Sequence, residues 1–297
     1  MIEIVPKIKD IRKKHGLRKG LKRLTKLYIN RVFFNYSKQD LKGDLNALGI
    51  LRGDIIFVHS ALSKIGYVKG GAPTIIKALM EVVSEEGTIL MPAYPMRGNA
   101  YKYVSKNHVF DVRKTTTGSG TIPEIFRTFP GTLRSLHPTH SVCAWGKDAQ
   151  YFIEEHEKQV GPFGFGTPFY KFIERGGKGL ILGAKLGNFT VLRCIEDIRK
   201  DYPYFTYCDK VFRLKVIDYK GNEFFVNTKV HNAIADPYRD VDGLLLPLFK
   251  KDGMVRVGKV GKAISYLVQG KGLFEYMEDL LSKGITPWKE AFPAFPG

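Results

Sequence analysis

Residues Gly53 to Ser63 read GDIIFVHSALS. The four apolar residues from Ile55 to Val58 follow a turn and precede polar residues, which is typical of a strand buried on both faces. The pattern returns at 88–91 and at 179–183, and segments with helical spacing of apolar residues separate these strands. Apolar strands that alternate with helices predict an α/β fold whose parallel or mixed sheet is covered on both faces.

The segments around this strand carry helix and turn signals. Ser37 and Asp40 have the spacing of a helix start, and three leucines at helical spacing follow them. Further predicted elements are helices at 72–84, near 151–159 and near 168–175, and a β-hairpin at 211–228. Because no linker or repeat interrupts residues 37–297, we expect one α/β domain there, with the hairpin as an insertion.

Three loops directly follow predicted strands. They are His59–Ser63, Pro92–Arg97 and Ala184–Thr190. In α/β folds, ligands bind at the carboxyl ends of strands, where loops present side chains and free backbone N–H groups. We therefore expect these three loops to contribute to the functional site.

The composition is that of a globular protein and excludes a largely disordered or fibrous one. The chain has 297 residues, of which 44% are hydrophobic and 26% charged, and no stretch approaches the ~20 apolar residues of a membrane span. Its three cysteines are too few for a disulfide framework, and its first residues lack the apolar run of a secretory signal. These features predict a cytoplasmic location.

Positive charge is concentrated in the first part of the chain. The formal net charge is +18, and residues 1–36 contribute half of it, with eleven basic and two acidic side chains. Apolar residues recur there at helical spacing, so we predict a basic amphipathic extension. Two roles fit this pattern. The extension contacts the anionic inner face of a membrane, or it is a solvated helix packed on the domain or on another subunit of a homo-oligomer. No nucleic acid is expected, because no zinc-finger spacing, RNP aromatic pair or basic stripe accompanies the charge.

Several common motifs are absent from the sequence. It has no phosphate-binding G-x-x-x-x-G-K-[ST] loop and no G-x-S-x-G nucleophile elbow; residues 117–121 come nearest to the elbow but have the wrong spacing. The glycine-rich stretch 161–166 lacks a preceding strand, so it is not a dinucleotide fingerprint. His137 and His140 lack a third ligand at zinc-site spacing, and no metal is expected.

Five segments, taken in order, resemble one family. They are Gly53–Gly66, Gly70–Pro92, Phe110–Gly146, the pair Gly161–Pro168 and Leu182–Asn188, and Val257–Ala263. The second ends in E-G-T-x-x-M-P, and the third contains R-S-x-H-P and A-W-G. This ordered set is similar to the aminoglycoside 3-N-acetyltransferase family, the YokD-like acetyl-CoA enzymes. The resemblance extends over about residues 37–283 and leaves out the basic extension.

The resemblance implies both a fold and an activity. The fold is a three-layer α/β/α sandwich with a mixed, largely parallel sheet, and the activity is direct transfer of an acetyl group from acetyl-CoA to a primary amine on an amino sugar. It also implies a coenzyme channel lined by His59, Ser60, Leu62, Ser63, Arg113, Thr116, Arg134, Ser135 and His137. Arg113 and Arg134 would meet the phosphates of coenzyme A, because guanidinium groups bind phosphate in a bidentate manner. Ser60 and Ser63 would hold the pantetheine amides.

The chain departs from the family pattern at one important position. Family enzymes carry T-x-L-H-x-x-E after a glycine-ended strand, where the His and the Glu serve catalysis. Residues 190–196 read Thr-Val-Leu-Arg-Cys-Ile-Glu, so Arg193 stands where the family has His, and Glu196 is present. A guanidinium stays protonated at any working pH and cannot accept a proton from an attacking amine. Arg193 is instead expected to bind an acidic group on the acceptor or to stabilise the thioester oxyanion.

Three side chains are candidates for the missing base. In order of preference they are His231, which lies after the hairpin where family members contact the acceptor, then Glu196, then His140 in the coenzyme-side loop. A nearby guanidinium would work against Glu196, since it lowers the pKa of a carboxyl group.

The same departure bears on the acceptor. Aminoglycosides are polycations, whereas this chain is strongly basic. An acidic or nucleotide-linked amino sugar destined for a surface polysaccharide therefore fits the charge better. Two alternatives stay open: a true aminoglycoside 3-N-acetyltransferase, and a catalytically degenerate protein that binds acyl-CoA or a sugar.

Overall fold

The computed structural model describes residue 25 and residues 35–204, 206–232 and 235–289. The predicted basic extension, 1–36, therefore lies outside the described residues except at Thr25, Asn35 and Tyr36. Asn35 and Tyr36 form the short strand β1 (Asn35–Tyr36), which pairs in parallel with β3 (Tyr67–Val68). No helix within the described ranges has the length and apolar character needed to cross a membrane.

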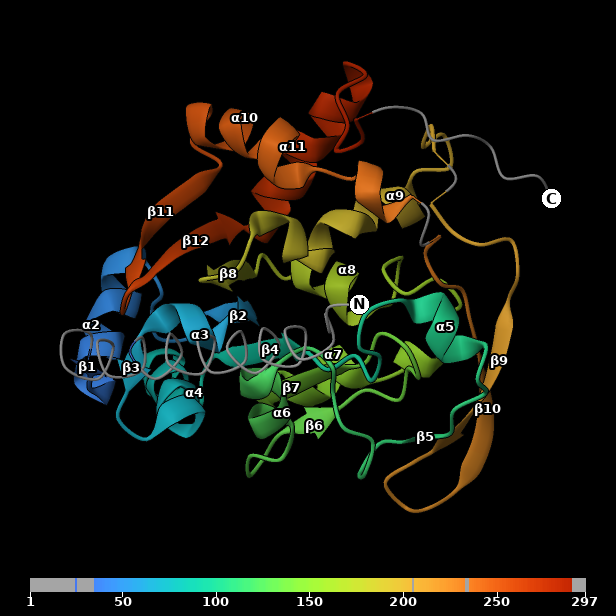
Figure 1. The fold of residues 1–297 in the computed structure, drawn as a ribbon, viewed down its shortest axis with the longest axis horizontal. Helices are drawn as coiled ribbons and strands as arrows, with labels where there is room; N and C mark the ends of the chain where they lie inside the picture. Colours follow the sequence, from blue (N-terminus) through green and yellow to red (C-terminus); the bar gives the residue numbers. More distant parts are fainter. Residues whose placement is uncertain (1–24, 26–34, 205, 233–234, 290–297) are drawn as a thin grey trace, which may run out of the picture.

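A seven-stranded sheet forms the centre of the fold (Figure 1). Its strands are β2 (Ile55–Ser60), β4 (Thr88–Pro92), β6 (Leu133–Arg134), β7 (Val142–Gly146), β8 (Lys178–Leu182), β11 (Val255–Val260) and β12 (Ala263–Gln269). Their order across the sheet is β11-β12-β8-β2-β4-β7-β6. The strand quoted first, β2, is thus the central one, and His59 and Ser60 lie at its carboxyl end.

The sheet is mixed, as predicted, but the expectation that it is largely parallel is wrong. Only the two pairings of β2, with β4 and with β8, are parallel, whereas the four outer pairings are antiparallel. For two of these four pairings, β11–β12 and β6–β7, the reason is the length of the connection. The two-residue turn at 261–262 joins β11 to β12, and the loop 135–141 joins β6 to β7. A parallel crossover needs a dozen residues or more, so such short loops connect antiparallel neighbours.

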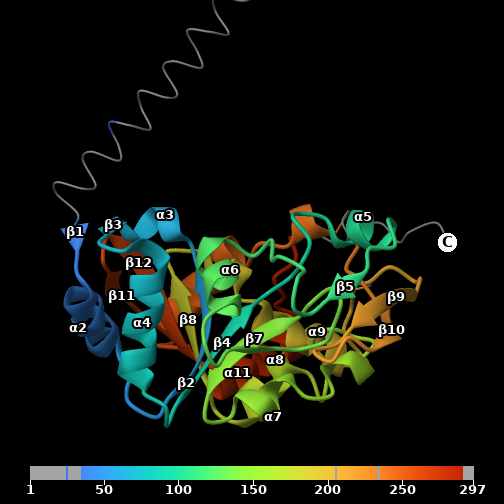
Figure 2. The ribbon, with the colours of Figure 1, turned by 90° about the horizontal axis from the view of Figure 1, so that it is seen from below.

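Helices cover both faces of the sheet, which confirms the three-layer α/β/α arrangement (Figures 1 and 2). One layer consists of α2 (Lys38–Leu48), α4 (Gly71–Val83) and α6 (Thr121–Arg127), and the other contains α7 (Ala149–Ile153), α8 (Pro168–Glu174) and α11 (Gly270–Ser282). The alternation along β2 shows how one strand serves both layers. Ile56 and Val58 pack into the first hydrophobic cluster, and Phe57 between them packs into the second.

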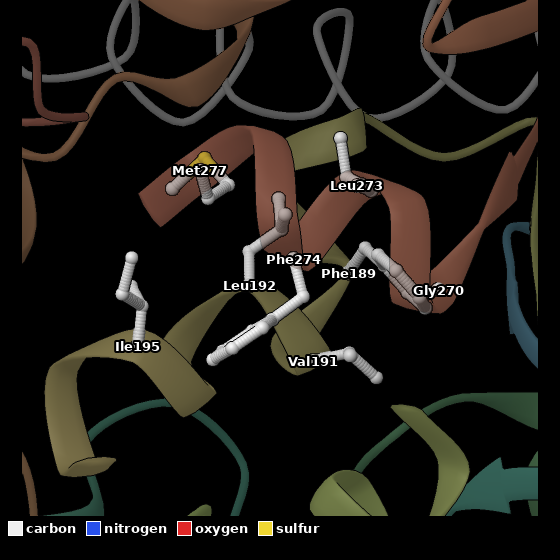
Figure 3. Close-up of a pocket in the computed structure, with 8 residues that line it drawn as sticks. All are labelled: Phe189, Val191, Leu192, Ile195, Gly270, Leu273, Phe274 and Met277. Carbon is white, nitrogen blue, oxygen red and sulfur yellow. The ribbon is translucent and has the colours of Figure 1, made fainter. Parts of the chain in front are cut away.

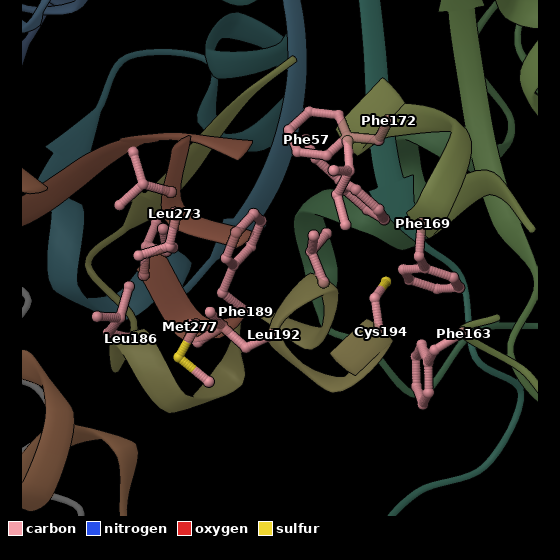
Figure 4. Close-up of a cluster of buried hydrophobic side chains, with 14 of the residues drawn as sticks. Phe57, Phe163, Phe169, Phe172, Leu186, Phe189, Leu192, Cys194, Leu273 and Met277 are labelled. Atoms are coloured by element: carbon pink, nitrogen blue, oxygen red, sulfur yellow. The ribbon is translucent and has the colours of Figure 1, made fainter. Parts of the chain in front are cut away.

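The second cluster is built around aromatic rings (Figure 4). The ring of Phe57 lies 5.4 Å from that of Phe169, 5.6 Å from that of Phe172 and 6.5 Å from that of Phe189, centre to centre. Phe163 extends the group, with its ring 4.8 Å from that of Phe169. These buried rings pack together beneath the loops that follow β2 and β8.

The first predicted helix forms as expected. Ser37 Oγ accepts the backbone N–H of Asp40, and the Asp40 carboxylate accepts the backbone N–H of Ser37, a complete capping box. All three leucines of the predicted apolar face are buried in α2. The helix predicted near 151–159 is instead interrupted. α7 ends at Ile153, and a single turn at His156–Lys158 follows Glu155, whose φ of +62° cannot continue a right-handed helix.

A separate three-stranded sheet contains the predicted hairpin. Strands β9 (Phe212–Ile217) and β10 (Glu223–Thr228) pair in antiparallel fashion, which confirms the hairpin, and β5 (Phe110–Asp111) adds in parallel to β9. Figure 1 shows this small sheet at the end of the molecule opposite α2. The remaining helices are α3 (Leu62–Ile65), α5 (Ala100–Val104), α9 (Cys194–Ile198) and α10 (Leu246–Lys251), with single turns at Leu186–Asn188, Thr190–Arg193, Asp236–Tyr238 and Val241–Leu245.

Candidate active site

The three suspected loops meet at the carboxyl ends of the parallel strands. Thr190, after β8, connects them, because its Oγ1 lies 2.8 Å from the hydroxyl of Tyr94 and 3.5 Å from Nε2 of His59. Tyr94 follows β4, and His59 is at the end of β2. The topology of the sheet thus brings together segments that are up to 131 residues apart in the chain.

The carboxylate of Glu196 contacts three basic side chains of the site. Its side chain is fully buried in the first turn of α9. The carboxylate lies 3.1 Å from Nε of Arg239, 3.4 Å from Nη1 of Arg193 and 3.7 Å from Nε2 of His231. Burial raises the pKa of Glu196, but the charges of Arg193 and Arg239 and the contact with His231 outweigh it and lower this pKa to about 2. Glu196 is therefore ionised at any working pH.

His231 is the histidine that contacts this carboxylate. Its side chain is about one-tenth exposed. Its ring lies 4.3 Å from the ring of Tyr207, 5.4 Å from that of Phe163 and 6.3 Å from that of His140. The predicted bases His231 and Glu196 are thus direct neighbours, with His140 behind them. A carboxylate beside an imidazole is the arrangement that orients a histidine base and stabilises its protonated form.

His140 and His59 are fully enclosed. Burial lowers the pKa of His59 to about 3, and burial together with His137 and His231 lowers that of His140 well below its usual value. Nδ1 of His140 lies 2.9 Å from Thr139 Oγ1, and its ring packs edge-on against Tyr94. Both imidazoles are therefore neutral, and each is a poor proton acceptor.

The predicted coenzyme-side residues of the first loop lie beyond His59. Ser60 closes β2, and Leu62 and Ser63 open the short helix α3. The hydroxyl oxygen of Ser60 is buried and has no hydrogen-bond partner among the described residues. Ser63 is exposed, and Leu62 packs against the first hydrophobic cluster. A buried hydroxyl without a partner at the end of a strand is suited to bind a polar group of a ligand.

Arg134 does not fit its predicted role as a phosphate ligand. It is 2% exposed, and its guanidinium donates to the carbonyl oxygens of Ala93 and Thr115 and to Ser141 Oγ. Its central carbon lies 4.7 Å from the centre of the Phe110 ring. With these N–H groups used and no access to solvent, Arg134 instead ties the loop before α6 to the end of β4.

Ser135 and His137 are also internal. Ser135 Oγ lies 2.9 Å from Nδ1 of His156 and accepts the backbone N–H of Val142. The His137 ring stacks on that of His156 at 4.6 Å, and burial lowers the pKa of His137 to about 3. Neither side chain reaches a surface on which a coenzyme could lie, so the predicted contact of Ser135 and His137 with coenzyme A does not fit this structure.

Arg113 and Thr116 are the predicted coenzyme residues of this region that reach solvent. Both are exposed, and Arg113 forms an ion pair with Asp111 at 3.0 Å. Between them and the site, Gly118 allows a close approach of two loops, since a Cβ at this position would lie 2.0 Å from the carbonyl oxygen of Met96. A phosphate would have to compete with Asp111 for the Arg113 guanidinium.

Four residues of the site were not predicted from the sequence: Tyr94, Asp197, Tyr207 and Arg239. Tyr94 lies within the suspected loop Pro92–Arg97 and could have been selected there. Asp197 directly follows Glu196. Tyr207 and Arg239 carry no motif signal, because only the fold brings them to α9.

An apolar pocket lies between α11 and the segment that carries Arg193 and Glu196 (Figure 3). Its lining residues are Phe189, Val191, Leu192, Ile195, Gly270, Leu273, Phe274 and Met277. None of these lining residues offers a polar side chain to orient a reacting group. Within the described ranges, no group of three or more His, Cys, Asp or Glu residues is arranged to hold a metal ion.

Comparison with known proteins places this geometry in a family. The family model for aminoglycoside 3-N-acetyltransferase matches residues 57–282. The chain is 35% identical over 255 residues to the SPbeta prophage-derived aminoglycoside N(3')-acetyltransferase-like protein YokD of Bacillus subtilis (strain 168), covering 80% of this chain and 89% of that protein. It is 30% identical to aminoglycoside N(3)-acetyltransferase IX of Micromonospora chalcea, covering 81% and 91%.

A solved structure agrees with the sequence comparisons. The structure described as "AAC-IIIb binary with CoASH" superposes with a TM-score of 0.71 at 29% identity, covering 88% of this chain and all of that one. The chain therefore belongs to the aminoglycoside 3-N-acetyltransferase family of acetyl-CoA-dependent N-acyltransferases.

Proposed function

We propose that the protein transfers the acetyl group of acetyl-CoA to the primary amine of an amino sugar, with His231 as the base. The observation that carries this proposal is the contact between Nε2 of His231 and the buried carboxylate of Glu196, at 3.7 Å. It supplies an oriented imidazole in a site where the family's usual histidine is replaced by Arg193.

The reaction balances with these groups. The amine lone pair attacks the thioester carbonyl carbon, and His231 accepts the proton that the nitrogen must lose. The tetrahedral intermediate collapses as the carbon–sulfur bond breaks, and the coenzyme leaves as a thiolate that takes up a proton. Glu196 stays ionised, because its pKa is about 2, and stabilises the imidazolium of His231.

Coenzyme A would enter from the β2 side of the site. Ser60 has a buried hydroxyl without a described partner, and Ser63 is exposed beside it, which supports contact with the pantetheine amides. Arg113 supplies an exposed guanidinium for a phosphate. His59, whose Nε2 lies 3.5 Å from Oγ1 of Thr190, would hold the loop after β8 against this channel.

For the acceptor, a buried donor of Arg239 favours an anionic amino sugar. Two guanidiniums, Arg193 and Arg239, surround the single carboxylate of Glu196. Nη2 of Arg239 is buried and has no hydrogen-bond partner among the described residues, and a buried charged donor of this kind is costly. A carboxylate or phosphate on the acceptor, as in a nucleotide-linked sugar, would give this Nη2 donor a charged partner.

The role of His231 is tested by His231→Ala. We expect kcat to fall by about 100-fold or more, the usual size of a general-base contribution. His108→Ala is the matched control, because His108 is exposed, and it should keep the wild-type kcat. An unchanged kcat in His231→Ala would remove the proposed base.

The acceptor class is tested by competition between amines of different charge. We expect thiol release from acetyl-CoA with amino sugars that carry a phosphate or nucleotide diphosphate, and little with kanamycin-like polycations. In Arg193→His, the KM of the anionic acceptor should rise by about 10- to 100-fold, the value of a hydrogen bond between charged groups, with the KM of acetyl-CoA unchanged. Efficient acetylation of aminoglycosides with no turnover of anionic sugars would instead identify an aminoglycoside 3-N-acetyltransferase. No thiol release with any amine would identify a binding protein.

We also propose that residues 1–36 act separately from catalysis. Their charge of +9 supports contact with an anionic surface. Deletion of this extension should preserve kcat in solution and abolish binding to vesicles that contain anionic lipid. If the truncated protein loses activity without vesicles, the extension is part of the enzyme domain or of its oligomer.

A further inference from the structure

Asp197 follows Glu196 on α9, but its carboxylate serves a different set of groups. It accepts the hydroxyl of Tyr207 on one oxygen and the backbone N–H of Phe163, at 2.9 Å, on the other. These partners come from two segments on either side of α9, the glycine-rich loop that precedes α8 and the segment that precedes β9. One carboxylate thus connects two parts of the chain that are not otherwise neighbours in sequence.

The glycine-rich loop is shaped to reach this carboxylate. A Cβ at Gly161 would lie 3.0 Å from the Oδ2 atom of Asp197, and a Cβ at Gly164 would lie 3.6 Å from its Cβ. The first distance is tighter than most Cβ contacts, so a side chain at residue 161 would push the Asp197 carboxylate away by a few tenths of an ångström, and glycine avoids this. This explains a glycine-rich stretch that is not a nucleotide fingerprint.

Both partners of Asp197 place an aromatic ring against His231. The Tyr207 ring lies 4.3 Å from that of His231, and the Phe163 ring lies 5.4 Å from it. The backbones of Tyr207 and His231 also form an antiparallel bridge. The imidazole is therefore held between two rings whose positions depend on the same carboxylate.

We propose that Asp197 is a positioning residue, which acts through Tyr207 and Phe163 to fix the plane of the His231 imidazole beside Glu196. The proposal rests on His231 being the base. Proton transfer requires this alignment, and a displacement of about 1 Å in a reacting group can cost about 100-fold in rate. Burial raises the pKa of Asp197 to about 6, in spite of its two hydrogen bonds, so the carboxylate is mostly ionised and able to accept both at neutral pH.

A double-mutant cycle distinguishes positioning from general stabilisation. Tyr207→Phe removes only the hydroxyl and keeps the ring. We expect it to lower kcat by about 10-fold, with the KM of acetyl-CoA unchanged. Combined with His231→Ala, it should cost less than 2-fold more, because a residue that acts through His231 has no effect once that side chain is absent. Asp197→Asn should reproduce the loss, and Tyr266→Phe, on strand β12, is the control that should keep wild-type kcat.

The outcomes separate this inference from the proposed base. If His231→Ala lowers kcat by 100-fold while Tyr207→Phe and Asp197→Asn leave it unchanged, the base stands and the positioning role is overturned. Equal losses from Tyr207→Phe in the presence and absence of His231 also overturn it, since they indicate a structural role. If His231→Ala itself has no effect, the proposed base fails first, and the positioning role fails with it.

Discussion

Two arginines, Arg134 and Arg239, are both buried close to the active site, yet their surroundings differ. Arg134 donates to two backbone carbonyls and a serine hydroxyl, and none of these acceptors is charged. Arg239 donates from Nε to the carboxylate of Glu196, and its Nη2 has no described partner. The first guanidinium is satisfied by the protein itself, whereas the second is satisfied only in part.

This difference distinguishes an arginine that stabilises the fold from an arginine that can bind a ligand. A buried cation that donates to backbone carbonyls and a serine hydroxyl holds the loops in place, and a ligand could reach it only by displacing those atoms. A buried cation with a donor left over beside a carboxylate and a second guanidinium, Arg193, is suited to a ligand. Arg134, Ser135 and His137 are thus enclosed by the protein, whereas the donor without a described partner lies beside Glu196.

The strongest test of the scaffold is Arg134→Met. The substitution keeps most of the apolar stem but removes the Arg134 donor to the Thr115 carbonyl and one of the two donors to the Ala93 carbonyl, which keeps its bond from the Ser141 hydroxyl. We expect the free energy of unfolding to fall by about 3–5 kcal/mol, measured by urea denaturation. Arg52→Ala, which removes an exposed ion pair with Glu86, should change it by less than ~1 kcal/mol. A loss of less than 1 kcal/mol for Arg134→Met would mean that Arg134 is not part of the scaffold.

The pH dependence of stability should come from the histidines of the scaffold. The pKa of His59 and that of His137 are about 3 in the folded protein, against about 6.5 in the unfolded chain, so the unfolded chain binds more protons between these values. Stability is therefore complete above pH 6.5 and falls as the pH falls. At pH 5.5 His59 and His137 should each cost about 1.4 kcal/mol, and His140 and His156, whose pKa values burial also lowers, should add to this loss.

Glu196 should affect the free energy of unfolding over a different pH range from these histidines. Its folded pKa of about 2 lies below its unfolded value, so its contribution is lost only below about pH 4.3. Urea denaturation between pH 7.5 and 5.5 should therefore report the histidines and not Glu196. Asp197 opposes them in part, because its pKa is raised to about 6 and its protonation in the folded protein adds stability as the pH falls. A free energy of unfolding that does not change over this range would show that these imidazoles are not buried in the neutral form.

On the ligand side, Arg239→Gln should affect the acceptor and not the coenzyme. We expect kcat/KM for an anionic acceptor to fall by about 10- to 30-fold, with the KM of acetyl-CoA unchanged, measured by steady-state thiol release. Arg199→Gln, at an exposed ion pair with Asp201, is the matched control and should have no effect. An equal rise in the KM of both substrates would assign Arg239 to the scaffold.

The smallest effect is expected for Arg113→Ala. Because Arg113 is exposed and already paired with Asp111, a phosphate gains little from it. The KM of acetyl-CoA should rise by about 3- to 10-fold, with the stability and the acceptor KM unchanged. A KM equal to that of the wild type would remove Arg113 from the coenzyme site.

The sequence was a good guide wherever local signals decide the structure. The capping box at Ser37, the central strand Ile55–Ser60 and the hairpin were predictable, because each depends on neighbouring residues. The directions of the outer strands were not, since they depend on where the strands end and on how the chain connects them across the fold. The strand β5 was missed because two residues carry no periodicity.

For the site, the type of each residue indicated which reactions its side chain could perform, but not whether that side chain is exposed to solvent. The family resemblance implied that Arg193 stands at a histidine position, and the sequence offered His231 and Glu196 as candidate bases. It could not show that Arg134 is enclosed, because an arginine after a strand reads the same whether it faces solvent or the core. Tyr207 and Arg239 reach α9 only through the tertiary fold, so no spacing rule finds them.

The parallel pairing of β5 with β9 has a consequence for how the chain folds. It joins Phe110 to Val216, roughly one hundred residues further along the chain. A contact of this separation carries a large loop-closure entropy and forms after local ones. The segment that carries Tyr207, His231 and Arg239 to α9 flanks this pairing. We therefore expect the acceptor side to assemble after the local β9–β10 hairpin, together with the equally long-range pairing of β2 with β8 in the core.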